Sequence, residues 1–236
     1  MAKLSRERLL KVGFSGPSGA GKTTSCEYFG RHTGFTALEG DEIMFKGLSV
    51  YPERTIKIFG RALEPGENER EFAYGNYLPL TYEKEYNLFE LMRDYVEEQL
   101  RWAFHNPTTD FRSHDVLHEA VLFQPEGLPE GIAAEMCGFH RAKDLKRDTD
   151  FTVIVDSNPG QRKKMLAQRP NMQGFIKAGM FDEIIAIRET VQGDLLKGAR
   201  PHLRIKNNYD EESLIRGQQQ IIAKMKEKGF EVQNLI

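Results

Sequence analysis

The feature that most constrains how this chain can fold is the stretch GPSGAGKTT, residues 16–24. It matches the pattern G-x-x-x-x-G-K-[ST] at Gly16, Gly21, Lys22 and Thr23, between an apolar run, LLKVGFS, and a helix-like segment, KTTSCEYFG. Glycines lack a Cβ atom, so the backbone N–H groups of such a loop can curl around an anion. A helix that begins there adds partial positive charge at the same point. The stretch therefore predicts a phosphate-binding loop (P-loop) between a strand and a helix.

Each residue type in this loop has a predicted role. The contacts with a bound nucleotide are predicted for Gly16, Ser18, Gly19, Ala20, Gly21, Lys22, Thr23 and Thr24. Lys22 would bring a full positive charge to the β- and γ-phosphates, and the hydroxyl of Thr23 suits Mg²⁺. We therefore expect ATP and Mg²⁺ as cofactors. A chance glycine-rich turn is the alternative, and the strand-to-helix context argues against it.

Bulk composition narrows the class of protein. The chain has 236 residues, of which 39% are hydrophobic and 29% charged, with a net charge of −2. No basic field favours nucleic acid as a partner, and no apolar run approaches the roughly 20 residues that a bilayer requires. The first residues lack the apolar core of a signal peptide. Cys26 and Cys137 are far apart and fit no disulfide framework, so we expect a cytoplasmic protein.

Short apolar runs alternate with helical segments along the chain, which is typical of an α/β protein. Strands are expected over residues 9–15, 36–40, 120–124, 152–156 and 203–206. Helices are expected over residues 22–32, 85–104, 161–168, 180–195 and 211–228. We predict a single domain, 1–236, with the P-loop NTPase fold: a doubly wound, mostly parallel, five-stranded sheet with helices on both faces.

The segment 46–86 differs from the rest of the chain. It is rich in Pro, Gly, Glu, Arg and Tyr, and its apolar residues follow no clear period. Long insertions in compact domains often form lids or substrate loops, so we expect that role here. A surface excursion without function is the alternative.

An acidic cluster follows the second predicted strand, in the stretch ALEGDEIMF. Ligands of doubly wound sheets collect at the carboxyl ends of the strands. Asp41 could there accept a proton from a hydroxyl that attacks the γ-phosphate. Glu39 and Glu42 could take its place, and a helix-capping or solvated Asp41 is the bland alternative.

The third predicted strand, AVLFQPEGL, ends in an acid, Glu126. A carboxylate at a strand end could hold water bound to Mg²⁺, so Glu126 is predicted near the metal. Pro-Glu-Gly is also good turn chemistry, which leaves a plain turn as the alternative.

Basic residues follow the fourth predicted strand, TVIVDSNPG. Arg162, Lys163, Lys164 and Arg169 fall in a segment, 158–172, that could close over the phosphates as a lid. We expect Arg162 and Arg169 to act in catalysis, and a solvated basic helix is the alternative. Near the chain end, the asparagines of IKNNYD could border the base of a nucleotide or cap the next helix.

Together these stretches resemble the phosphoribulokinase/uridine kinase family of P-loop small-molecule kinases. The resemblance lies in GPSGAGKTT, EGDEIMF, LFQPEGL and VIVDSNPGQRKKMLAQR, which occur in the order typical of that family. By that likeness, phosphate and metal contacts would fall to Lys22, Thr23 and Glu126. Asp41 would be the catalytic base, and Arg162 and Arg169 would belong to the lid.

We therefore expect an ATP-dependent kinase whose acceptor is a hydroxyl of a small metabolite: a sugar, a sugar phosphate or a nucleoside. Two alternatives stay open, a nucleoside monophosphate kinase-like enzyme and a non-catalytic nucleotide-dependent switch. A GTPase would need N-K-x-D, where this chain has IKNNYD. The expected partner is the small-molecule acceptor, with no nucleic acid and no membrane, and a homodimer is compatible with the sequence.

Overall fold

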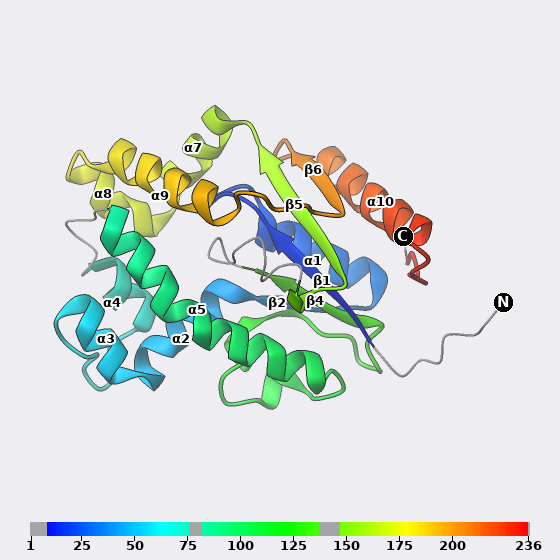
Figure 1. Ribbon diagram of the computed structural model, residues 1–236, viewed down its shortest axis with the longest axis horizontal. Coiled ribbons are helices and arrows are strands. Elements are labelled where there is room, and N and C mark those ends of the chain that lie inside the picture. Colours follow the sequence, from blue (N-terminus) through cyan, green and yellow to red (C-terminus); the bar gives the residue numbers. More distant parts are fainter. Residues whose placement is uncertain (1–8, 76–81, 137–146, 236) are drawn as a thin grey trace.

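The computed structural model describes residues 9–75, 82–136 and 147–235, and these residues form a layered α/β structure (Figure 1). The sheet has the order β3-β2-β4-β1-β5-β6. Its strands are β1 (Leu10–Ser15), β2 (Thr36–Glu39), β3 (Val121–Phe123), β4 (Gly131–Glu135), β5 (Phe151–Ser157) and β6 (Leu203–Asn207). Neighbouring strands are parallel except β2 and β3, which are antiparallel. The predicted α/β class with a mostly parallel sheet is confirmed, with six strands in place of five.

The additional strand is β4, in the middle of the sheet between β2 and β1. Its sequence, GIAAE, is buried along its whole length and shows no alternation. Small residues and a flanking LPE segment make this run look like part of a loop. Its burial on both faces is what a central parallel strand requires.

Helices flank the sheet on both faces. The described helices are α1 (Lys22–Thr33), α2 (Gly40–Val50), α3 (Pro52–Phe59), α4 (Glu69–Gly75), α5 (Tyr82–His105), α7 (Pro159–Ala167), α8 (Gln173–Lys177), α9 (Phe181–Leu195) and α10 (Glu211–Glu227). Short 3-10 turns cover Phe111–Ser113, His118–Ala120 and Pro170–Met172. Side-chain caps explain two of the starts. The Asp210 carboxylate accepts from the Ser213 N–H at 2.7 Å, and the Asn158 side chain caps α7 in the same way.

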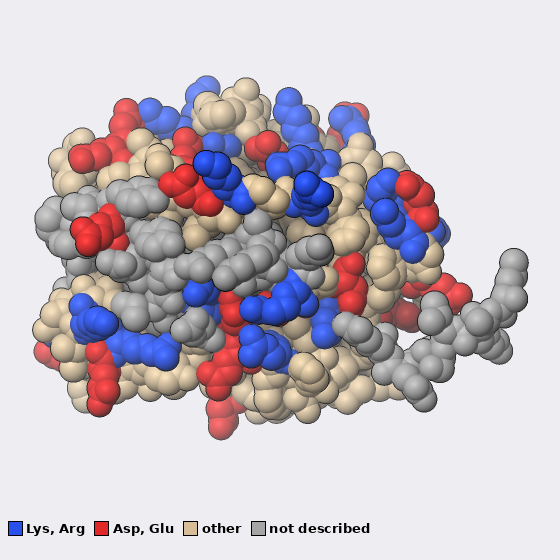
Figure 2. Space-filling view, viewed as in Figure 1, with Lys and Arg blue, Asp and Glu red and all other residues tan. Residues whose placement is uncertain are grey.

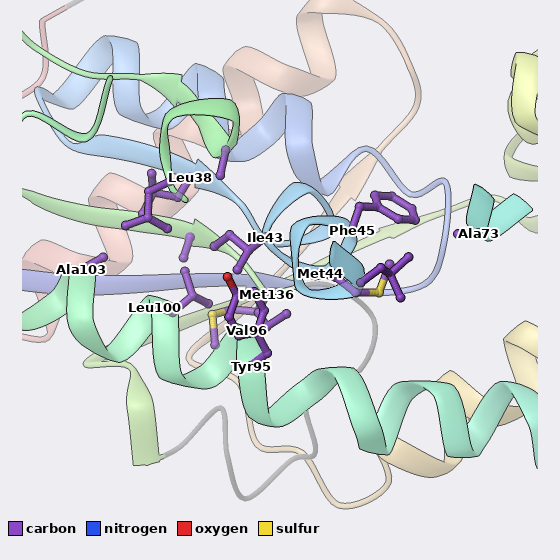
Figure 3. Close-up of a cluster of buried hydrophobic side chains, with 14 of the residues drawn as sticks. Leu38, Ile43, Met44, Phe45, Ala73, Tyr95, Val96, Leu100, Ala103 and Met136 are labelled. Atoms are coloured by element: carbon purple, nitrogen blue, oxygen red, sulfur yellow. The ribbon is translucent and has the colours of Figure 1, made fainter. Parts of the chain in front are cut away.

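Two hydrophobic clusters lie on opposite faces of the sheet. Val12 and Phe14 of β1 pack toward α1 and α10, whereas α5 and α9 cover the other face (Figure 1). Figure 3 shows the cluster on the face covered by α5 and α9, in which Ile43 of α2 lies against Val96 and Leu100 of α5. Each fully buried side chain of this kind stabilises the fold by about 1.5–3 kcal/mol.

The segment 46–86 is more regular than the sequence suggests. Its described residues include the end of α2, then α3, α4 and the start of α5, while residues 76–81 lie outside the described residues. Pro52 starts α3, and Gly60, with φ +81°, ends it in the left-handed conformation. Because these helices are short and are separated by proline and glycine residues, the sequence of this segment shows no continuous 3.6-residue period of apolar residues. The lid role of this segment stays a prediction.

Three further observations concern surface charge, thiols and membrane-crossing helices. On the face shown in Figure 2, basic and acidic side chains of the described residues are interspersed. Cys26 is a buried free thiol, and Cys137 lies outside the described residues. In the part of the chain that the structure describes, no helix combines the length and apolar content that a membrane crossing needs.

Candidate active site

The P-loop lies between β1 and α1, where the sequence places it. Gly16 and Gly21 have φ values of +143° and +88°, which L side chains rarely adopt. A Cβ atom at Gly16 would lie 2.1 Å from the carbonyl oxygen of Val155, and one at Gly21 would lie 2.0 Å from Nδ2 of Asn207. The glycines are therefore required by close packing as well as by backbone conformation. The result is a backbone cradle at the start of α1 that fits a polyphosphate.

Lys22 is folded back across this cradle. Its Nζ atom donates to the Pro17 carbonyl oxygen at 3.3 Å and lies 3.4 Å from Oε1 of Glu135. Only 8% of Lys22 is exposed, so this charge is held inside the site. The second oxygen of Glu135 accepts from the Gly40 N–H at 3.2 Å. Glu135 thus connects the P-loop lysine to the start of α2.

Glu135 is a site residue that the local sequence pattern does not predict. It ends the central strand β4, is 1% exposed, and lies in register with Glu39 of β2. Because β1, β2 and β4 are parallel, their carboxyl ends meet at one edge of the sheet beside the P-loop. The signal was present as an acid that ends the apolar run GIAAE, but the run was not recognised as a strand.

Glu126 lies elsewhere. In the antiparallel pair, Val121 faces Leu38 and Phe123 faces Ala37, so β3 runs away from the P-loop edge. Glu126 follows β3 in an exposed loop. The structure therefore does not bring Glu126 to Lys22, and the carboxylate that lies beside the lysine is Glu135.

Carboxylates crowd this edge of the sheet. Asp41 lies in the first turn of α2, whose N-cap is Glu39. Burial, followed by the charges of Asp41 and Glu42, raises the pKa of Glu39 to about 7. Burial and then Asp41 also raise the pKa of Glu135, and Lys22 opposes this shift. A site with so much negative charge favours cations, and the Lys22 ammonium lies beside Glu135 within it.

The raised pKa of Glu39 predicts a pH dependence of stability. The folded state keeps this proton to higher pH than the unfolded chain does. Its stabilising effect is complete below about pH 4.5 and is lost as the pH rises through about 7. Glu39→Gln cannot ionise, so we expect it to flatten the fall in the free energy of unfolding across this window. Urea unfolding at a series of pH values measures the slopes, and equal slopes for both proteins would contradict the prediction.

The two predicted lid arginines have different environments. Arg162 is 6% exposed; its Nη1 donates to the Ser157 carbonyl oxygen at 3.2 Å, and its Nη2 pairs with Glu189 of α9. Arg162 therefore links α7 to α9 next to Gly19 of the P-loop. Arg169 is exposed, and its charge, like that of Arg70, opposes the rise in the pKa of Glu39, so Arg169 lies on the side of the acidic cluster.

A buried glutamine also contacts the P-loop from a distant element. Gln192 of α9 is 5% exposed, and its Oε1 accepts from the backbone N–H of Ser18 at 2.7 Å. A glutamine within an amphipathic helix carries no local sign of this role, so sequence analysis did not identify it. The contact ties α9, and through Arg162 also α7, to the phosphate loop.

The metal-binding potential of the site depends on a bound phosphate. Among the described residues, no group of three or more His, Cys, Asp or Glu side chains is arranged to hold a metal ion. Mg²⁺ commonly uses only one or two protein ligands and takes the rest from phosphates and water. The hydroxyl of Thr23 and the carboxylate of Glu135 fit that kind of site.

The fold is shared with solved structures of low sequence identity. The structure of TT1252 from Thermus thermophilus has a TM-score of 0.59 at 16% identity, and the match covers 93% of this chain and 99% of that chain. A shikimate kinase from Bacteroides thetaiotaomicron has a TM-score of 0.51 at 14% identity, with 92% and 99% covered. Neither a protein-family model nor a curated protein sequence matches the chain. The likeness shows the α/β P-loop fold.

Proposed function

We propose that the chain is an ATP-dependent kinase that transfers the γ-phosphate to a hydroxyl group of a small metabolite. The observation that carries this proposal is the meeting of Lys22, Glu135 and Asp41 at the carboxyl edge of the parallel sheet. A phosphate-binding cation beside a carboxylate pair supplies the groups that phosphoryl transfer to an alcohol requires. The fold likeness to a kinase supports the same class.

The P-loop would hold the triphosphate through backbone N–H groups at the start of α1. Lys22 would leave Glu135 and move to the β- and γ-phosphates, where its charge stabilises the transition state. Mg²⁺, when bound, neutralises phosphate charge, and Thr23 together with Glu135 would hold it directly or through water. Glu135 takes the role first predicted for Glu126.

Asp41 would accept the proton of the acceptor hydroxyl. It lies at the start of α2, close enough to Glu135 and Glu39 for its charge to raise the pKa of both. The neighbouring Glu42 is already paired with Arg70 of α4. Asp41 is therefore the carboxylate we assign as the general base.

Arg169 would approach the transferred phosphate from the segment 158–172. Arg162 would position that segment through its contacts with Ser157 and Glu189. Within the kinases, we favour a phosphoribulokinase/uridine kinase-like enzyme, because of the P-loop and the acid after β2. The acceptor would then be a sugar, a sugar phosphate or a nucleoside.

The test of this function is coupled ADP release on a panel of sugars, sugar phosphates, nucleosides and nucleoside monophosphates. We expect ATP turnover that depends on an acceptor with a free hydroxyl. Turnover only with nucleoside monophosphates would favour the phosphate-acceptor alternative. No acceptor-dependent turnover, despite nucleotide binding, would favour a nucleotide-dependent switch.

Glu135→Gln tests the metal role of the buried carboxylate. Glutamine keeps the side-chain shape and can still accept from the Gly40 N–H, but it has no charge for Mg²⁺. We expect kcat/KM for ATP to fall about 10- to 100-fold, with a higher Mg²⁺ requirement.

Glu126→Gln is the matched control, since it makes the same change in an exposed loop away from the P-loop edge. Steady-state kinetics across a Mg²⁺ titration compares the two variants. Loss of activity in Glu126→Gln together with normal kinetics in Glu135→Gln would contradict the assignment.

A further inference from the structure

Two side chains, one from the last residue of β6 and one from the turn after it, hold the backbone of the P-loop. The hydroxyl of Tyr209 donates to the Gly19 carbonyl oxygen at 2.8 Å, and Nδ2 of Asn207 donates to the Ala20 carbonyl oxygen at 2.9 Å. The two residues of the first contact are 190 positions apart in the sequence, and those of the second are 187 positions apart. Figure 1 shows β6 and α10, which flank this turn, on the side of β5 away from α5.

Fixing a carbonyl fixes the next N–H group as well. The peptide bond is planar and trans, so the C=O of one residue and the N–H of the next point in opposite directions. The Gly19 carbonyl is held by Tyr209, and the Ala20 N–H on its far side donates to the Pro17 carbonyl oxygen at 3.2 Å. The Ala20 carbonyl is held by Asn207, which turns the Gly21 N–H away from Asn207. The Asn207 contact therefore directs the Gly21 N–H, and the Tyr209 contact holds the Gly19–Ala20 peptide in the turn that positions the following P-loop amides.

The turn that carries Tyr209 is itself constrained. Tyr209 has φ +63°, and no other non-glycine residue in the described ranges has a positive φ. This conformation is unfavourable for tyrosine and persists only where its surroundings impose it. Oδ1 of Asn207 accepts from the Tyr209 N–H at 2.8 Å, which closes the turn. The Tyr209 hydroxyl oxygen also lies 2.9 Å from Oγ of Ser157, at the end of β5.

We propose that Tyr209 and Asn207 are positioning residues that orient the P-loop amides for the triphosphate. The inference rests on the proposed function, because it assigns a role within the same nucleotide site. The tyrosine hydroxyl has one proton, which the Gly19 carbonyl takes, so Ser157 donates to the same oxygen and anchors it. The strained turn is thereby fastened to both the sheet and the P-loop.

Tyr209→Phe removes only the hydroxyl group and tests the proposal. Calorimetry would measure binding of three probes: Mg-ATP, magnesium tripolyphosphate and adenosine. We expect the Kd values of Mg-ATP and tripolyphosphate to rise about tenfold, since a buried carbonyl loses its donor and the loop its anchor. Adenosine, which carries no phosphate, should bind both proteins equally.

Tyr95→Phe is the matched control. Its side chain lies on α5 in the hydrophobic cluster of Figure 3, away from the P-loop, so removal of its hydroxyl should leave the Kd values of all three probes unchanged. Asn207→Ala provides a second variant. Because both side chains act on one loop, the double variant should weaken tripolyphosphate binding by less than the product of the single effects.

Three outcomes separate this inference from the proposed function. If Tyr209→Phe weakens ATP and adenosine but leaves tripolyphosphate unchanged, the residue contacts the base and the inference is overturned. If all probes bind Tyr209→Phe and wild type equally, the inference is also overturned, while the kinase proposal stands. If wild type binds neither Mg-ATP nor tripolyphosphate, the proposed function itself fails.

Discussion

Lys22→Ala should lower kcat about 10³-fold while the protein remains folded. The lysine is the only described cation whose ammonium lies within the P-loop cradle, 3.4 Å from Glu135 Oε1. Without Lys22, no full positive charge from this position stabilises the negative charge that the transferred phosphate carries in the transition state. ADP release at saturating ATP and acceptor measures the loss.

The fold should survive this change because Glu135 can become neutral. Burial already raises the pKa of this carboxyl, and Lys22 lowers it, so without the lysine the proton is held to higher pH. Lys224→Ala on α10, which removes an exposed partner of Glu227, is the control and should keep normal kinetics. An active Lys22→Ala enzyme with unchanged kcat would contradict the role of the P-loop lysine.

The second large effect is expected for Asp41→Asn. If the acceptor is an alcohol, loss of the base should lower kcat about 10²- to 10⁴-fold, since asparagine cannot accept the proton. If the acceptor is already a phosphate, no base is needed and the change should be mild. Pre-steady-state measurement of the chemical step, with the acceptor found in the panel, separates the two cases.

Glu42→Gln and Glu39→Gln are the comparison variants for Asp41→Asn. Glu42 is paired with Arg70, and Glu39 lies beneath the turn as the N-cap residue of α2. We expect each to keep a chemical step faster than that of Asp41→Asn. A mild Asp41→Asn beside a severely impaired Glu42→Gln would move the base to the neighbouring acid.

The P-loop could be predicted from sequence because its determinants are local. The glycines, the lysine and the change from an apolar run to a helix lie within residues 10–33, and β1 and α1 follow that pattern closely. The major helices were predicted for a similar reason. Each has a continuous 3.6-residue period or a clear cap, such as Asp210 before α10.

Which carboxylate lies beside Lys22 depends on long-range strand pairing. Glu126 and Glu135 both follow short apolar runs, and composition alone does not separate them. What separates them is strand direction: β4 pairs in parallel with β1 and β2, whereas β3 pairs antiparallel with β2. Strand pairing is set by residues far apart in the chain, which a local pattern does not contain.

The supports of the P-loop illustrate the same limit. The loop is contacted by Gln192 of α9, by Asn207 at the end of β6 and by Tyr209 in the turn that follows. In the sequence, the asparagines suggest a turn or a cap, and the glutamine suggests a helix surface. Their contacts with the loop arise only when β5 and β6 bring these elements beside β1.

Calorimetric titration of the full chain with Mg-ATP tests whether the first strand–helix junction binds a triphosphate. We expect saturable binding with a Kd below about 1 mM, weakened in Lys22→Ala. Absence of any binding of Mg-ATP by the folded wild-type protein would contradict it.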